Sequence, residues 1–187
     1  MAIINITEIF FLIIVTIVIG YIFADKLKIP RKLTEPLLQY KFDFKDLLYA
    51  SLITAPGIVF HELGHKFLAL SFGLDAVFKI WLTGLLIALA LKLINSPLIL
   101  IAPGFVEIHG SATASQFTLV AFAGPFINLI LWIIPLLMIK YGNYKRKTLI
   151  NLHLLKQINM WLFIFNMLPI PPLDGSKVFF GLFKLLF

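Results

Sequence analysis

Residues 56–70, PGIVFHELGHKFLAL, place two histidines and a glutamate inside an apolar stretch that runs from Leu47 to Phe72. On a helix, His61 and His65 are four residues apart and share one face, where two imidazole nitrogens can hold one metal ion. Glu62 lies beside that pair and can take a proton from water that the metal has made acidic, then deliver it to a leaving amine. The pattern therefore predicts a catalytic zinc site in the middle of a helix.

The setting of this motif strengthens the prediction. A helix over Leu47–Phe72 would reach about 39 Å, more than the roughly 30 Å of a bilayer's hydrocarbon core. Ionisable groups at that depth are costly, and they persist mainly where a cavity or a partner compensates. The alternative is purely structural: the histidines hydrogen-bond to neighbouring helices, and Glu62 pairs with Lys66 one turn further on.

Composition indicates an integral membrane protein. Of the 187 residues, 60% are hydrophobic and 13% are charged, far from the quarter-charged composition of soluble domains. We expect an all-α, multi-pass protein of the cell membrane with about four to six transmembrane helices and a short membrane-associated β element. The chain has room for a single membrane-embedded domain over residues 1–187, with its core at about 47–187. No cysteine is present, so a zinc ion must be held by His, Asp, Glu and water.

Apolar runs long enough to cross a bilayer set the expected helices. They are Ile3–Ala24, Leu47–Phe72, Phe117–Tyr141 and Thr148–Leu168. The run Phe78–Ile94 is barely long enough, and could cross the membrane or form a re-entrant or interfacial helix. Polar and apolar residues alternate in Phe105–Gly110, which predicts a short strand or hairpin there.

The net charge of +7 comes mainly from two basic stretches. Ten of the basic residues are Lys26, Lys28, Arg31, Lys32, Lys41, Lys45, Lys140, Lys145, Arg146 and Lys147. Neither stretch interleaves aromatic residues with a basic face, so no nucleic-acid partner is expected. Loops next to anionic lipid headgroups explain these charges better.

A catalytic zinc needs a third protein ligand, for which Asp174 is the best candidate. It follows prolines 169, 171 and 172, which forbid a continuous helix and predict extended backbone just past a membrane-spanning helix. Asp174 could instead cap the last helix, and the two roles are compatible. Other polar groups fit less well: Glu107 and His109 share a solvated strand face, His153 is interfacial, and Glu8 is expected at headgroup depth.

Asn128 is a further candidate, early in the helix that follows the predicted strand. Its amide could donate to a peptide carbonyl and stabilise the oxyanion that forms during attack. A hydrogen bond between helices explains it equally well.

Three motifs in order resemble the site-2 protease family of intramembrane zinc metalloproteases. They are HELGH at 61–65, Ala-Gly-Pro-x-x-Asn at 123–128 and Asn-x-x-Pro-x-Pro-Pro-Leu-Asp-Gly at 166–175. The resemblance implies that His61, His65 and Asp174 bind one Zn²⁺ per chain and that Glu62 is the catalytic acid and base. It also implies that Asn128 positions the substrate main chain, and that residues 97–110 form a membrane-embedded β element that pairs with an unwound substrate.

We therefore expect an intramembrane zinc endopeptidase that cuts a transmembrane segment of a substrate protein within the lipid bilayer, as in regulated intramembrane proteolysis. An alternative is a membrane metal-ion transporter that uses the same His and Asp residues, and another is a non-catalytic binding partner of the same fold. On orientation two rules conflict: the resemblance places the HELGH end of its helix towards the cytosol, and the positive-inside rule predicts the opposite.

Overall fold

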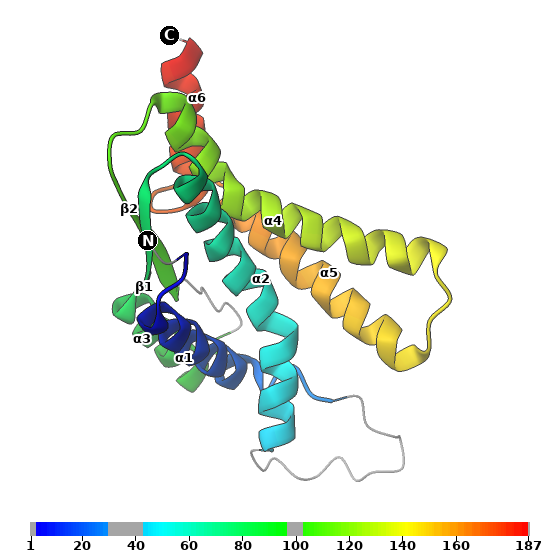
Figure 1. The fold of residues 1–187 in the computed structure, drawn as a ribbon. Helices are drawn as coiled ribbons and strands as arrows, with labels where there is room; N and C mark the ends of the chain where they lie inside the picture. The colour runs from blue at the N-terminus through cyan, green and yellow to red at the C-terminus, as the bar shows by residue number, and fades with distance from the viewer. Residues whose placement is uncertain (1–2, 30–42, 97–102, 187) are drawn as a thin grey trace, which may run out of the picture.

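The computed structural model describes residues 3–29, 43–96 and 103–186 (Figure 1). The described elements are, in chain order, α1 (Ile6–Phe23), α2 (Phe44–Ser71), β1 (Asp75–Ile80), α3 (Leu82–Leu93), β2 (Gly104–His109), α4 (Ala114–Tyr141), α5 (Arg146–Asn166) and α6 (Asp174–Leu186). Helix α2 lies at the centre, with α1 against one side and the antiparallel α4–α5 pair against another. Helix α6 packs on the first half of α4.

Three of the described helices are long and apolar enough to cross a membrane: α1, α2 and α4. This confirms a polytopic, helical membrane protein. Helix α5 coincides closely with the expected run Thr148–Leu168, but it carries Lys156 and three asparagines within its 21 residues and is not among these candidates. Two of these asparagines, Asn151 and Asn159, hydrogen-bond to residues of other helices, as described below.

The predicted strand is confirmed, and its partner is a strand that we did not predict. β2 pairs antiparallel with β1, in a register that joins Asp75 to His109 and Ile80 to Gly104. The turn after α2 leads directly into β1 through Gly73, whose φ of +74° lies in the left-handed region that glycine often adopts after a helix. Residues 97–102, the start of the predicted β element, lie outside the described residues.

The run Phe78–Ile94, which we considered as a possible membrane crossing, does not form a single helix. Its first residues belong to β1, and the helix that follows, α3, has only 12 residues. At 1.5 Å per residue, α3 reaches about 18 Å and falls well short of the hydrocarbon core.

Glycines let α2 approach its neighbours closely. A Cβ on Gly57 would lie 2.9 Å from Asn159 Oδ1 on α5, and one on Gly64 would lie 3.0 Å from the Ala123 carbonyl oxygen on α4. These two contacts bring α4 and α5 against the face of α2 that carries the histidines.

Glu8, which we expected at headgroup depth, is buried within the protein and forms an ion pair with Lys66. Its Oε1 also accepts a hydrogen bond from the backbone N–H of Phe78 at 2.7 Å. The pair therefore joins α1, α2 and β1. Lys66 therefore does not pair with Glu62. The purely structural explanation of the motif required that salt bridge.

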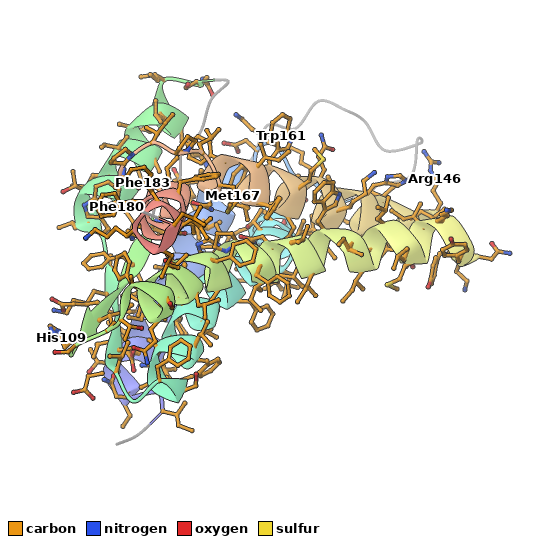
Figure 2. All side chains as sticks on the ribbon, turned by 90° about the horizontal axis from the view of Figure 1, so that it is seen from above. His109, Arg146, Trp161, Met167, Phe180 and Phe183 are labelled. Carbon is orange, nitrogen blue, oxygen red and sulfur yellow. The ribbon has the colours of Figure 1, made fainter. Side chains whose placement is uncertain are left out.

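The second basic stretch surrounds the tight turn between α4 and α5. Figure 2 shows Arg146 at the far end of this helical hairpin, away from α6. The separation fits a lipid-headgroup location better than a role at the histidines. Of the first stretch, Arg31, Lys32 and Lys41 lie outside the described residues.

The buried Glu8–Lys66 pair predicts an asymmetric response to substitution. Lys66→Met leaves the Glu8 carboxylate buried without its ammonium partner, which typically costs about 3–5 kcal/mol. The double variant Glu8→Gln/Lys66→Met removes both charges and should recover much of the lost stability. Thermal unfolding of the purified proteins in detergent measures both effects.

The pair between Lys79 and Glu107 supplies the control, since Lys79 and Glu107 are 49% and 34% exposed, against 3% for each member of the buried pair. Lys79→Met should leave the unfolding midpoint nearly unchanged. Equal midpoints for Lys66→Met and Lys79→Met would contradict a stabilising contact between α1 and α2 at Glu8.

Candidate metal centre

The α-helical spacing of α2 brings the two histidine rings together. His61 and His65 have their ring centroids 4.8 Å apart in an edge-to-face arrangement, and their Nε2 atoms are separated by 3.1 Å. Both side chains are buried. Two nitrogens on successive turns of one helix thus point at the same small volume.

Asp174 reaches this volume from the first turn of α6. Its Oδ2 lies 3.0 Å from His61 Nε2 and 3.2 Å from His65 Nε2. The next residue, Gly175, fixes the start of α6, because a Cβ there would lie 2.4 Å from the Met167 carbonyl at the end of α5. The backbone between α5 and α6 forms turns and bends instead of the extended segment that the prolines predicted.

Hydrogen bonds on the far side of each ring determine which nitrogen carries the proton. His65 Nδ1 lies 2.7 Å from the Val120 carbonyl oxygen, and His61 Nδ1 lies 2.6 Å from Asn128 Oδ1. Both partners are oxygen acceptors, so each Nδ1 must donate its hydrogen. In neutral rings, each Nε2 is then left with a lone pair directed at Asp174.

Three lone-pair atoms therefore converge on one point, an arrangement that a cation would stabilise. Tetrahedral zinc with ligand distances of about 2.0–2.1 Å places its ligand atoms roughly 3.3 Å apart. The observed separations of 3.0–3.2 Å are close to that value. Across residues 3–29, 43–96 and 103–186, His61, His65 and Asp174 form the single group of His, Asp and Glu side chains that could hold a metal ion.

Gly124 on α4 completes the fit. A Cβ at this position would lie 2.3 Å from His65 Nε2 and 2.7 Å from His61 Nε2. Any other residue would push a carbon atom onto both nitrogens. The donor set and the space kept open beside it both suit a small cation.

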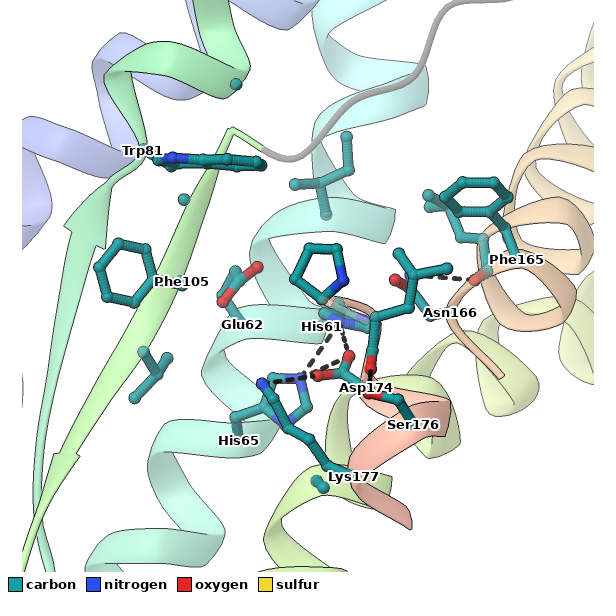
Figure 3. Close-up of a pocket in the computed structure, with 18 of the residues that line it drawn as sticks. His61, Glu62, His65, Trp81, Phe105, Phe165, Asn166, Asp174, Ser176 and Lys177 are labelled. Atoms are coloured by element: carbon teal, nitrogen blue, oxygen red, sulfur yellow. Dashed lines mark hydrogen bonds and ion pairs between the residues drawn. The ribbon is translucent and has the colours of Figure 1, made fainter. Parts of the chain in front are cut away.

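The three side chains lie on the wall of a cavity of about 770 Å³. Figure 3 shows Glu62 beside His61 with its carboxylate directed into this space, and Trp81 and Phe105 on the side of the β-sheet. Most of the remaining lining is apolar. Water and a peptide bond can thus meet the candidate ligands and an acid in one partly open pocket.

Four of the five predicted site residues come together here: His61, Glu62, His65 and Asp174. Asn128 lies behind His61, is completely buried and is not part of the cavity wall. Its expected contact with the substrate main chain stays a prediction.

The weaker candidates lie elsewhere. Glu107 pairs with Lys79 and approaches His109, whose side chain is exposed on β2. His153 is exposed on α5. None of these side chains joins the histidines of α2.

Two polar residues near the site were missed by the sequence reasoning. Lys177 lines the cavity and lies 3.6 Å from Asp174 Oδ1, a contact that its three-residue spacing from Asp174 on a helix could have indicated. Asn159 is buried against Asn128, a residue 31 positions away, and no local spacing indicates such a contact.

Comparison with known proteins agrees with this site. The family model described as Peptidase family M50 matches residues 135–187. A protein of Methanocaldococcus jannaschii named "Putative zinc metalloprotease" is 38% identical over 127 residues, which cover 65% of this chain and 64% of that protein. A Bacillus subtilis protein with the same designation is 31% identical over 160 residues, covering 75% of this chain and 71% of that protein.

The chain thus spans less than two thirds of the length of the archaeal relative. No solved structure matches it significantly. The bacterial relative aligns over most of both chains, and the family model independently covers the segment that contains Asp174. Together these matches establish that the chain belongs to peptidase family M50, the site-2 protease family.

Proposed function

We propose that this multi-pass protein of the cell membrane is a zinc endopeptidase that hydrolyses a peptide bond within or next to a transmembrane segment of another protein. One observation carries the proposal. Three candidate ligand atoms converge at 3.0–3.2 Å on the wall of a cavity that also contains the Glu62 carboxylate. The designations of both relatives as zinc metalloproteases support the same reaction.

The residues divide the chemistry among them. His61 and His65, as neutral imidazoles, and Asp174, as a carboxylate, would hold one zinc ion. When bound, zinc supplies Lewis-acid chemistry, lowering the pKa of water and polarising a carbonyl group. Glu62 would accept the proton of the attacking water and deliver it to the nitrogen of the departing amine. Because Glu62 already faces the cavity, it needs no rearrangement of α2 to do so.

The depth of the site supports a membrane-embedded substrate. Helix α2 has 28 residues and so reaches about 42 Å, more than the roughly 30 Å of a hydrocarbon core. His61 lies ten residues before Ser71, the last residue of α2, which is about 15 Å along the axis. A peptide bond brought to the site would therefore be submerged.

A substrate segment must unwind locally to expose a peptide bond in this cavity. Unpaired backbone is tolerated at membrane depth only where it is buried in protein or lines a water-filled cavity. Residues 104–106 of β2 line the cavity, so an unwound segment could pair with this strand by β-addition, while Trp81 and Phe165 contact its apolar side chains.

The zinc site predicts that binding and catalysis can be separated. Purified His61→Ala, His65→Ala and Asp174→Ala should each lose activity and retain less zinc, because each loses one of three protein ligands. Glu62→Gln should keep its zinc and lose turnover. Metal analysis of the purified proteins and cleavage of a transmembrane substrate in detergent or liposomes measure the two properties. Zinc transport into liposomes that survives Glu62→Gln would instead identify a transporter.

Because Gly124 lies so close to both histidines, adding one methyl group there should affect zinc binding specifically. Gly124→Ala should sharply lower zinc retention, because its Cβ would press on both Nε2 atoms. Gly20→Ala is the control, since it crowds Ser51 between α1 and α2, away from the histidines. If both variants lost zinc equally, general helix crowding would account for the effect and the fit of the metal beside Gly124 would be wrong.

The unwinding step predicts a preference among substrates. A transmembrane segment with a central Asn-Gly should be cut faster than a matched Leu-rich segment, because Gly in a helix interior costs about 1 kcal/mol relative to Ala. Product mapping by mass spectrometry would locate the cut. Equal rates for both segments, or cuts confined to soluble flanks, would contradict cleavage within the membrane.

A further inference from the structure

Two buried asparagines lie behind the candidate metal ligands and away from the cavity. Asn128 on α4 is 0% exposed and Asn159 on α5 is 1% exposed. Buried amides in an apolar helix bundle are costly unless each polar atom finds a partner. Their partners therefore indicate what these two residues do.

The hydrogen bonds of the two amides are donated in one direction, from His61 through Asn128 and Asn159 to the Leu155 carbonyl of α5. Asn159 Nδ2 donates to the Leu155 carbonyl at 2.8 Å, which turns Asn159 Oδ1 towards Asn128. Asn128 Nδ2 donates to that Oδ1 at 3.0 Å and to the Gly57 carbonyl at 2.8 Å. Asn128 Oδ1 is then left to accept the hydrogen of His61 Nδ1 at 2.6 Å.

The Asn128 amide cannot be turned over without losing these hydrogen bonds. Turning the Asn128 amide over would place its oxygen against two other oxygens, those of Gly57 and Asn159. It would also place its NH₂ group against the N–H of His61. The Asn159 oxygen thus selects the orientation of Asn128, and Asn128 selects the tautomer and the plane of the His61 ring.

We infer that Asn128 and Asn159 are positioning residues that act in series on His61 and set the affinity of the site for zinc. The inference rests on the proposed function, because it assumes that His61 Nε2 is a zinc ligand. Metal-bound histidines usually donate their other N–H to an oxygen acceptor, and loss of that acceptor commonly weakens metal binding about 10- to 100-fold. The same argument gives Asn128 a role other than contact with substrate.

Zinc affinity, measured by competition with a chelator on the purified protein in detergent, is the primary readout. Asn128→Ala should weaken zinc binding about 10- to 100-fold, and Asn159→Leu by about tenfold, at the lower end of the range for outer-shell partners. Asn159→Asp keeps an oxygen at the position of Oδ1 and, when protonated, a donor for the Leu155 carbonyl, so it should bind zinc more tightly than Asn159→Leu.

Asn151→Leu is the matched control. Asn151 is also on α5 and also hydrogen-bonds to α2, through the Tyr49 hydroxyl at 2.9 Å, but it has no link to His61. This variant should leave zinc affinity unchanged even if it lowers the unfolding temperature. A thermal midpoint for every variant separates loss of folding from loss of metal.

The double variant Asn128→Ala/Asn159→Leu tests the serial order. If Asn159 acts through Asn128, the double variant should bind zinc no more weakly than Asn128→Ala alone. Independent, additive losses would contradict action in series. Unchanged zinc affinity in Asn128→Ala together with a raised KM would overturn the inference in favour of substrate binding. If the wild type itself retained no zinc, the proposed function would fail before this comparison is reached.

Discussion

Three lone pairs that point at one another inside a helix bundle repel unless a cation lies between them, and this constraint organises the rest of the molecule. The two histidine nitrogens belong to one helix, so α2 alone can fix their separation. The carboxylate must come from another segment, and the turns between α5 and α6 place Asp174 next to both nitrogens. Gly124 keeps α4 from filling the space where the atoms meet.

The polar groups around this point are arranged in layers. The candidate ligands and Glu62 face a largely apolar cavity on one side. Behind them, Val120 O and the Asn128–Asn159 pair satisfy the outer nitrogens of the rings. Further along α2, the Glu8–Lys66 pair joins α1 and β1 to the same helix. Each layer compensates polar atoms that would otherwise be costly in an apolar bundle.

Most of the features that could be predicted from the sequence depend on residues that lie close together in it. The four-residue spacing of His61 and His65 was sufficient to place both nitrogens on one face, and the alternation around Glu107 was sufficient to predict β2. Asp174 could be reached by elimination, because acids are scarce in the apolar stretches and zinc needs a third ligand.

Interactions between distant segments could not be predicted in the same way. Glu8 and Lys66 are 58 residues apart, so the ion pair depends on how α1 packs against α2. The strand β1 could not be predicted from the sequence, because Phe78 and its neighbours continue directly into the apolar helix α3. The role of Asn128 depends on which atoms surround it, and no pattern in the sequence indicates that its oxygen faces His61 and not the cavity.

The most direct test of the central claim is the zinc X-ray absorption spectrum of the purified wild-type protein. Two imidazoles and a carboxylate should give a first shell of nitrogen and oxygen at about 2.0–2.1 Å, together with the outer-shell scattering of two histidine rings. In Asp174→Ala the signal of both rings should persist in whatever zinc remains. A spectrum without imidazole scattering, or a wild-type protein that holds no zinc, would contradict a metal centre at His61, His65 and Asp174.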